Sequence, residues 1–149
     1  MTDPLHITFE VAVPQRHAFE TWTTRFDSWW PHSHTVSGRS DALIELEPRI
    51  GGEIGERLPD GSHHTWGTVT TWDPPSEFGY DWHFGREAAK ATQVRIRFVS
   101  LSQDRTQVEI QHAGWDGLGD EAATWRERNV GGWRSMLPHF LDQLERETR

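Results

Sequence analysis

Between positions 42 and 113, apolar residues alternate with polar ones in a series of short segments, and this period of two constrains the fold more than any other feature. Such alternation predicts half-buried strands, because successive side chains of a strand point to opposite faces of a sheet. The clearest segment places Phe78, Tyr80, Trp82 and Phe84 on one face. We predict further strands over residues 5–13, 42–47, 53–58, 64–72, 94–98 and 108–111.

Two segments have helical spacing instead. After the first strand, apolar residues recur three or four positions apart from Ala18 to Phe26, and this predicts a helical segment that closes at Pro31. Near the end of the chain, one apolar stripe runs from Trp133 to Leu144 and predicts a long helix, bent at Pro138. The pair Gly131–Gly132 is interpreted as a hinge or as the start of this helix.

An antiparallel sheet with one apolar face needs a cover, and the C-terminal helix is the only predicted element long enough to provide it. We therefore predict an α+β fold, in which a curved antiparallel sheet of about seven strands wraps around the long C-terminal helix. A short helical segment follows the first strand. The 149 residues fit one domain, spanning 1–149. Wherever the facing side chains do not fill the space between sheet and helix, a cavity is expected.

Composition narrows the possible functions. The formal net charge of -8 disfavours nucleic acid as a partner, because phosphate recognition requires clustered Lys and Arg. The absence of cysteine excludes disulfides, thiolate metal sites and a cysteine nucleophile. The N-terminal residues lack the basic and then apolar pattern of a secretory signal, and no apolar run is long enough to span a membrane. A cytoplasmic protein without a membrane partner is expected.

Several short motifs, in their order along the chain, resemble the bacterial relatives of the activator of heat-shock-protein-90 ATPase, within the SRPBCC (START-like) superfamily. The resemblance covers nearly the whole chain and implies a helix-grip fold, shared with the birch-pollen allergen, with a cavity between sheet and helix. It implies little about activity, because one fold hosts many functions. The motifs are Val13-Pro14, Trp29-Trp30-Pro31-His32, Glu47-Pro48-Arg49-Ile50-Gly51-Gly52, Trp66-Gly67-Thr68-Val69, Trp72-Asp73-Pro74-Pro75, His112-Ala113-Gly114-Trp115 and Gly131-Gly132-Trp133.

Nine tryptophans suggest broad aromatic walls, part core and part pocket. Apolar pockets usually carry a few placed polar groups, and His112, on the apolar face of its strand, is the best single candidate. Its ring could contact a ligand or could simply be a satisfied core histidine, and the second is favoured over catalysis. The residues expected to form the pocket wall are Trp30, Trp66, Tyr80, Trp82, His112 and Trp133.

Other candidate sites have weaker support. His32 with His34, and His63 with His64, are possible metal ligands, but neighbouring residues on a strand point in opposite directions. We therefore predict no metal site and no cofactor. No nucleophile elbow, phosphate loop or dinucleotide motif is present, so no catalytic residue is assigned. The acidic positions are interpreted as a solvated strand face. They are Glu45, Glu47, Glu53 and Glu56.

These features favour non-catalytic binding of a small hydrophobic or aromatic molecule between the sheet and the C-terminal helix. Two alternatives stay open. One is a chaperone-associated or stress-response interaction module that works through its surface. The other is a cyclase- or hydrolase-like enzyme that uses His112 with Tyr80 or an acidic neighbour. A chaperone or other protein, and a homodimer formed by sheet-edge pairing, are therefore possible partners.

Overall fold

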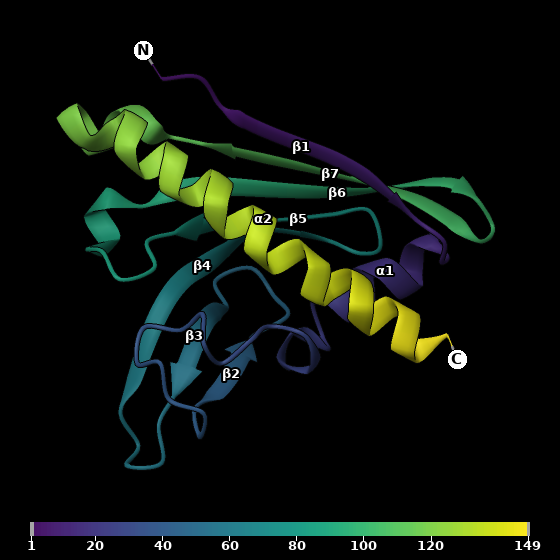
Figure 1. Cartoon of the computed structure of the whole chain (residues 1–149), viewed down its shortest axis with the longest axis horizontal. Helices are drawn as coiled ribbons and strands as arrows, with labels where there is room; N and C mark the ends of the chain where they lie inside the picture. The colour runs from purple at the N-terminus through teal and green to yellow at the C-terminus, as the bar shows by residue number, and fades with distance from the viewer. Residues whose placement is uncertain (1, 149) are drawn as a thin grey trace.

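Seven antiparallel strands form a single sheet that curves around one long helix in the computed structural model, which describes residues 2–148 (Figure 1). The order of the strands across the sheet is β1-β7-β6-β5-β4-β3-β2. The strands are β1 (Leu5–Val11), β2 (Leu43–Leu46), β3 (Glu53–Arg57), β4 (His63–Asp73), β5 (Glu77–Trp82), β6 (Thr92–Ser102) and β7 (Arg105–Ala113). The predicted helix-grip architecture is therefore confirmed.

The helices are α1 (Gln15–Trp22) and α2 (Ala122–Glu147), with 3₁₀ turns η1 (Phe26–Ser28), η2 (Ala88–Lys90) and η3 (Trp115–Glu121). The predicted C-terminal helix exists, but α2 begins at Ala122 rather than at the glycine pair. Gly131 and Gly132 lie inside the helix, as does Pro138. Tertiary packing of α2 outweighs the low helix propensity of glycine and proline. For this reason, the glycine pair does not mark the start of the helix. No helix among residues 2–148 is long and apolar enough to cross a membrane.

The inner face of the sheet carries the residues that alternate as apolar in the sequence. One row of paired residues runs across five strands, from Val69 through Tyr80, Val94 and His112 to Leu5. Residues paired across antiparallel strands share one face, so this register places Tyr80 and His112 on the same side, separated by β6. The sheet thus presents both candidate residues toward α2.

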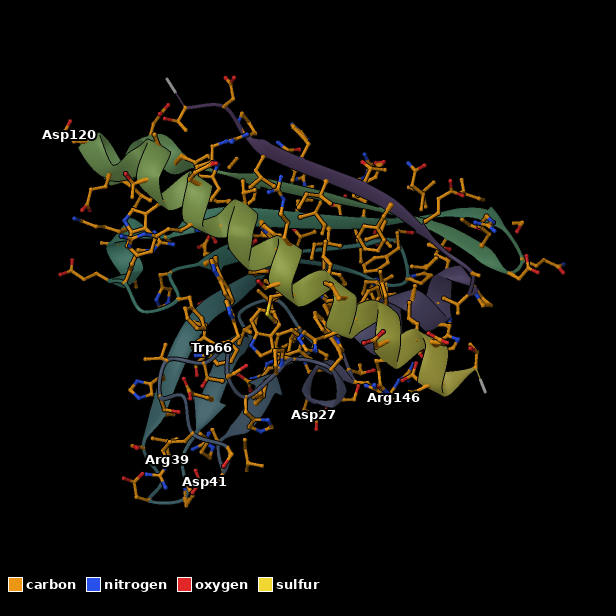
Figure 2. The ribbon with its side chains drawn as sticks, in the orientation of Figure 1. Asp27, Arg39, Asp41, Trp66, Asp120 and Arg146 are labelled. Carbon is orange, nitrogen blue, oxygen red and sulfur yellow. The ribbon has the colours of Figure 1, made fainter. Side chains whose placement is uncertain are left out.

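The sheet and α2 enclose an aromatic core, and side chains fill most of the space between them (Figure 2). Trp133, Met136, Phe140 and Leu144 form the buried stripe of α2. Phe140 packs against Trp22 with ring centroids 4.7 Å apart. Each buried side chain of this size contributes about 1.5–3 kcal/mol through removal of apolar surface from water.

A close approach of β3, β4 and β5 depends on glycine. A Cβ atom at Gly55 would lie 2.3 Å from the carbonyl oxygen of His64, and one at Gly67 would lie 2.0 Å from that of Asp81. The register between β3 and β4 also shifts between Ile54 and Gly55. Glycine at these two positions therefore lets the sheet curve toward α2, since any side chain would collide with backbone atoms.

Candidate functional site

The best candidate site is a small pocket between the inner face of β5 and the middle of α2. Its cavity has a volume of about 30 Å³. Buried aromatic rings form the wall, and half-buried residues form the rim. The lining residues are Trp30, His34, Tyr80, Trp82, Asn129, Gly132, Trp133 and Met136.

Four of the six predicted wall residues line this pocket, namely Trp30, Tyr80, Trp82 and Trp133. The fifth, Trp66, lies behind the wall, where its ring packs 5.7 Å from that of Trp30 and 6.2 Å from that of Trp82. The structure thus brings these predicted rings into one cluster. Each is buried, so any ligand would meet ring faces and edges rather than flexible surface side chains.

His112, the sixth predicted residue, lies behind Trp133 and does not line the pocket. The indole Nε1–H of Trp133 donates to Nδ1 of His112 over 3.2 Å. Because Nδ1 accepts, the ring proton is on Nε2 and is donated to the Thr92 hydroxyl, 2.7 Å away. The Thr92 hydroxyl in turn donates to the carbonyl of Trp82 over 3.2 Å. His112 is therefore a fully satisfied neutral imidazole.

The protonation of His112 is also fixed by its surroundings. Burial, together with the positive charge of Arg86, lowers the pKa of His112 to about 3. The imidazole therefore stays neutral near pH 7, and both of its nitrogens are already engaged. The His112 imidazole therefore orients Trp133, but it has no free nitrogen with which to exchange a proton with a ligand.

Two polar groups on the pocket wall lack partners. Neither the Tyr80 hydroxyl nor the Trp82 indole N–H makes a hydrogen bond with any residue from 2 to 148, although both residues are buried. Burial raises the pKa of Tyr80, so its hydroxyl keeps its proton and can donate. Neither of these two atoms is fully buried, because Arg86 Nε is the only fully buried side-chain nitrogen or oxygen of residues 2–148 without a partner. The pair is therefore the part of the wall best suited to form hydrogen bonds with a ligand.

The rim consists of residues that the sequence patterns did not single out for the pocket. His34 stacks on Phe84 with ring centroids 5.3 Å apart, and burial lowers its pKa. Asn129 donates its side-chain amide to the Trp125 carbonyl over 2.9 Å. A Cβ atom at Gly132 would have the His34 ring as its nearest neighbour, at 3.9 Å. Long-range packing alone brings residue 34 to residue 132, so no local pattern could have revealed this rim.

Glu56 was expected on a solvated strand face, and this expectation is wrong, since its residue is 2% exposed. It accepts hydrogen bonds from the Val36 amide at 2.6 Å, the Ser37 hydroxyl at 2.5 Å and the Trp66 indole at 3.1 Å. Burial raises its pKa, but the hydrogen bonds from Ser37, Trp66 and Val36 outweigh this and leave the pKa lowered. The carboxylate ties the segment that carries His34 to Trp66.

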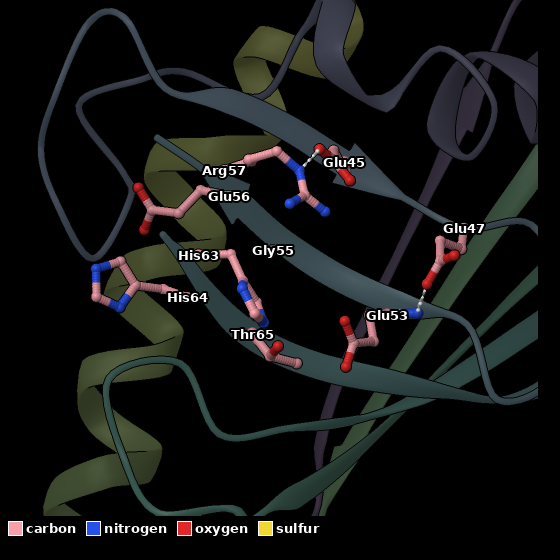
Figure 3. Close-up of a pocket in the computed structure, with 9 residues that line it drawn as sticks. All are labelled: Glu45, Glu47, Glu53, Gly55, Glu56, Arg57, His63, His64 and Thr65. Atoms are coloured by element: carbon pink, nitrogen blue, oxygen red, sulfur yellow. Dashed lines mark hydrogen bonds and ion pairs between the residues drawn. The ribbon is translucent and has the colours of Figure 1, made fainter. Parts of the chain in front are cut away.

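The histidines considered as metal ligands do not converge. A cavity of about 140 Å³ at β2, β3 and β4 is lined by residues that include His63, His64 and several glutamates, but the His64 and Glu56 side chains point away from that of His63 (Figure 3). Arg57 already pairs with Glu45 over 3.0 Å. His32 contacts the Ala42 carbonyl. Within residues 2–148, no group of three or more His, Cys, Asp or Glu side chains could hold a metal ion.

Solved structures with similar folds include proteins with different described roles. The anthrahydroquino-gamma-pyrone synthase Txn09 is 29% identical, with a TM-score of 0.59, over 83% of this chain and 84% of its own. The self-sacrificing resistance protein CalC from Micromonospora echinospora is 24% identical, with a TM-score of 0.69, over 97% and 95%. An Hsp90 activator from Plasmodium falciparum is 21% identical, with a TM-score of 0.65, over 95% and 94%.

The last two likenesses show the fold alone. No curated protein matches the chain. The family model described as activator of Hsp90 ATPase homolog 1-like protein matches residues 12–145, which include all of the lining residues described above. The chain therefore belongs to the activator of Hsp90 ATPase homolog 1-like family.

Proposed function

We propose that this protein binds a small, flat aromatic molecule in the pocket between β5 and α2, without chemically transforming it. The observation that carries the proposal is the pair of unpartnered polar groups, the Tyr80 hydroxyl and the Trp82 N–H, in an otherwise aromatic wall. Apolar walls with a few oriented polar groups are typical of small-molecule sites. A relative at 29% identity is named as a synthase of an anthrahydroquino-gamma-pyrone, which supports an aromatic ligand.

The pocket must widen to accept such a ligand. Its volume of about 30 Å³ suits one or two water molecules, whereas an engineered protein cavity that binds benzene measures about 150 Å³. Two lining side chains can yield without disturbing the sheet. Met136 has a flexible, unbranched side chain, and His34 lies in the segment between η1 and β2, which has no helix or strand. We infer that the ligand selects a conformation in which these two side chains have moved aside.

The two alternatives have less support. An enzyme that uses His112 as acid or base conflicts with the hydrogen bonds that occupy both ring nitrogens. A surface-acting chaperone module would expose a contiguous apolar patch. The large exposed apolar residues come from five different segments, so no single element of the described chain presents an apolar surface. They are Val36, Leu43, Ile50, Leu101 and Leu141.

The proposal can be tested with a pair of matched tryptophan variants. Trp82 lines the pocket, whereas Trp72 packs on Phe19 and Phe78 away from it. Isothermal titration calorimetry with 2-naphthamide should show that Trp82→Ala weakens binding at least about tenfold, while Trp72→Ala leaves the affinity unchanged. Chemical unfolding of both variants would establish that each is folded at the temperature of the titration.

Native mass spectrometry of the freshly purified protein complements this titration. A mass above that of the polypeptide, lost on denaturation, would identify a ligand carried through purification. The proposal is wrong if the unaltered protein fails to bind 2-naphthamide and carries no such mass. It is also wrong if both tryptophan variants weaken binding equally, because the pocket would then not be the site.

A further inference from the structure

Two arginines without acidic partners flank one tryptophan beside the pocket. The guanidinium carbons of Arg86 and Arg128 each lie 4.8 Å from the ring centroid of Trp125. Arg86 belongs to the connection between β5 and β6, and the other two residues belong to the first turns of α2. Neither guanidinium forms an ion pair with a carboxylate of residues 2–148, in a chain whose net charge is -8. Two cations that pack on the same ring, without a carboxylate partner among the described residues, favour an external anion.

Arg86 is only partly satisfied by the protein. Its two terminal nitrogens donate to the carbonyls of Lys90 at 2.7 Å and Trp82 at 3.1 Å. Its Nε atom is buried and has no hydrogen-bond partner, alone among the buried side-chain nitrogen and oxygen atoms of residues 2–148. Burial lowers the pKa of Arg86 without neutralising so strong a base, so the desolvated charge is uncompensated.

Several contacts link this pair of arginines to the pocket. Arg86 bonds the carbonyl of Trp82, which lines the pocket, and Trp125 accepts a hydrogen bond from Asn129, which forms the rim. The charge of Arg86 also reaches His112, whose pKa it helps to lower, and His112 bonds Trp133 of the wall. An anionic group at the arginines would therefore be attached to a molecule whose rings occupy the pocket.

We propose that the ligand is an aromatic acid, whose carboxylate is held beside the pocket by Arg86, while Arg128, on the same Trp125 ring, adds positive charge to this site. This inference rests on the proposed function and adds to it the chemical class of the ligand. Guanidinium groups suit a carboxylate because their planar donors match its two oxygens. The unpartnered Tyr80 hydroxyl and Trp82 N–H then serve polar substituents of the ring system.

The experiment compares 2-naphthoate with 2-naphthamide, which have nearly the same shape and differ in charge. Isothermal titration calorimetry of the unaltered protein should show about tenfold tighter binding of 2-naphthoate, as expected for a charge-assisted hydrogen bond. Arg86→Gln should abolish this preference, measured as the ratio of the two affinities, because loss of its bonds to the Trp82 and Lys90 carbonyls affects both probes alike. Arg128→Gln should reduce the preference and should not affect folding, because Arg128 is exposed and holds no other element.

A matched control is Arg134→Gln, which removes the same charge from an exposed position of α2 in a groove beside β1, away from the pocket. This variant should keep the full preference. The inference is overturned, with the proposed function intact, if the unaltered protein binds both probes equally or if the Arg86 and Arg128 variants weaken both equally. If the unaltered protein binds neither probe and carries no mass that is lost on denaturation, the proposed function itself fails.

Discussion

At the scale of single residues, the site is defined by which polar groups are satisfied and which are not. His112 is a fully buried polar side chain near the pocket, yet its two nitrogens are engaged by Trp133 and Thr92. Tyr80, two strands away in the same row of the sheet, has no hydrogen-bond partner among the described residues. His112, which its chemical type suggested, thus has a structural role. Tyr80, whose hydroxyl has no partner among the described residues, is the better candidate for ligand contact.

This contrast predicts the behaviour of Tyr80→Phe. Because the hydroxyl makes no hydrogen bond with any of residues 2–148, its removal should change the free energy of unfolding by less than about 0.5 kcal/mol. Affinity for 6-hydroxy-2-naphthamide, whose ring hydroxyl can pair with Tyr80, should fall about fivefold, through loss of one hydrogen bond worth roughly 1 kcal/mol. Urea unfolding and calorimetric titration measure the two quantities. A large loss of stability with unchanged affinity would mean that the hydroxyl serves the fold and not a ligand.

At the scale of elements, α2 carries two adjacent glycines whose surroundings differ. Gly131 is exposed and an added Cβ atom would meet nothing within 4 Å, whereas Gly132 lines the pocket opposite His34. Glycine inside a helix costs up to about 1 kcal/mol relative to alanine. At position 132, its absence of a side chain keeps space open at the rim.

Matched alanine variants separate these two effects. Gly131→Ala and Gly132→Ala should each raise the free energy of unfolding by about 0.5–1 kcal/mol, since neither Cβ atom would clash. Only Gly132→Ala should weaken ligand binding, because its methyl group narrows the rim beside His34. Thermal unfolding and calorimetry with 2-naphthamide test both expectations. Equal affinity in the two variants would argue that ligands enter elsewhere.

Most elements could be predicted from the sequence, because the alternation that marks a strand also determines which residues face α2. The existence of β5 and the inward position of His112 followed directly from this pattern. The burial of Glu56 was not predicted, although it lies two residues after the buried Ile54 on β3, because a carboxylate is rarely buried. Its partners Val36 and Ser37 come from a distant segment that no local pattern connects to β3. The rim around His34 was equally inaccessible to prediction, since it depends on how the segment between η1 and β2 folds back onto α2.

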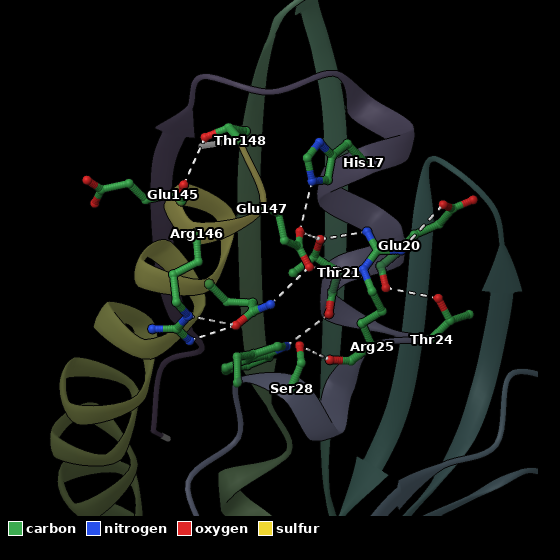
Figure 4. A network of polar contacts seen from close by, with 12 residues as sticks. His17, Glu20, Thr21, Thr24, Arg25, Ser28, Glu145, Arg146, Glu147 and Thr148 are labelled. Atoms are coloured by element: carbon green, nitrogen blue, oxygen red, sulfur yellow. Dashed lines mark hydrogen bonds and ion pairs between the residues drawn. The ribbon is translucent and has the colours of Figure 1, made fainter.

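At the scale of the whole molecule, one carboxylate joins the end of α2 to α1. Glu147 accepts hydrogen bonds from the Thr21 hydroxyl at 2.6 Å, from His17 at 2.8 Å and from Arg25 at 3.1 Å (Figure 4). These contacts bridge more than 120 positions of sequence and fix the far end of the helix on which the pocket is built. Burial would raise the pKa of Glu147, but hydrogen bonds from Thr21, Gln143 and His17 and the charge of Arg25 lower it to about 2.

A lowered pKa in the folded state means that ionised Glu147 stabilises the protein above the unfolded value of 4.5, and that this contribution is lost as the pH falls from 4.5 toward about 2. Glu147→Gln should therefore cost up to about 3 kcal/mol at pH 7 and almost nothing near pH 2. Glu127→Gln, which alters an exposed carboxylate of the same helix, serves as the control. Urea unfolding measured across this pH range would show the difference between the two variants closing on acidification. If the cost of Glu147→Gln were the same at every pH, the carboxylate charge would contribute nothing, and packing alone would hold α2 against α1.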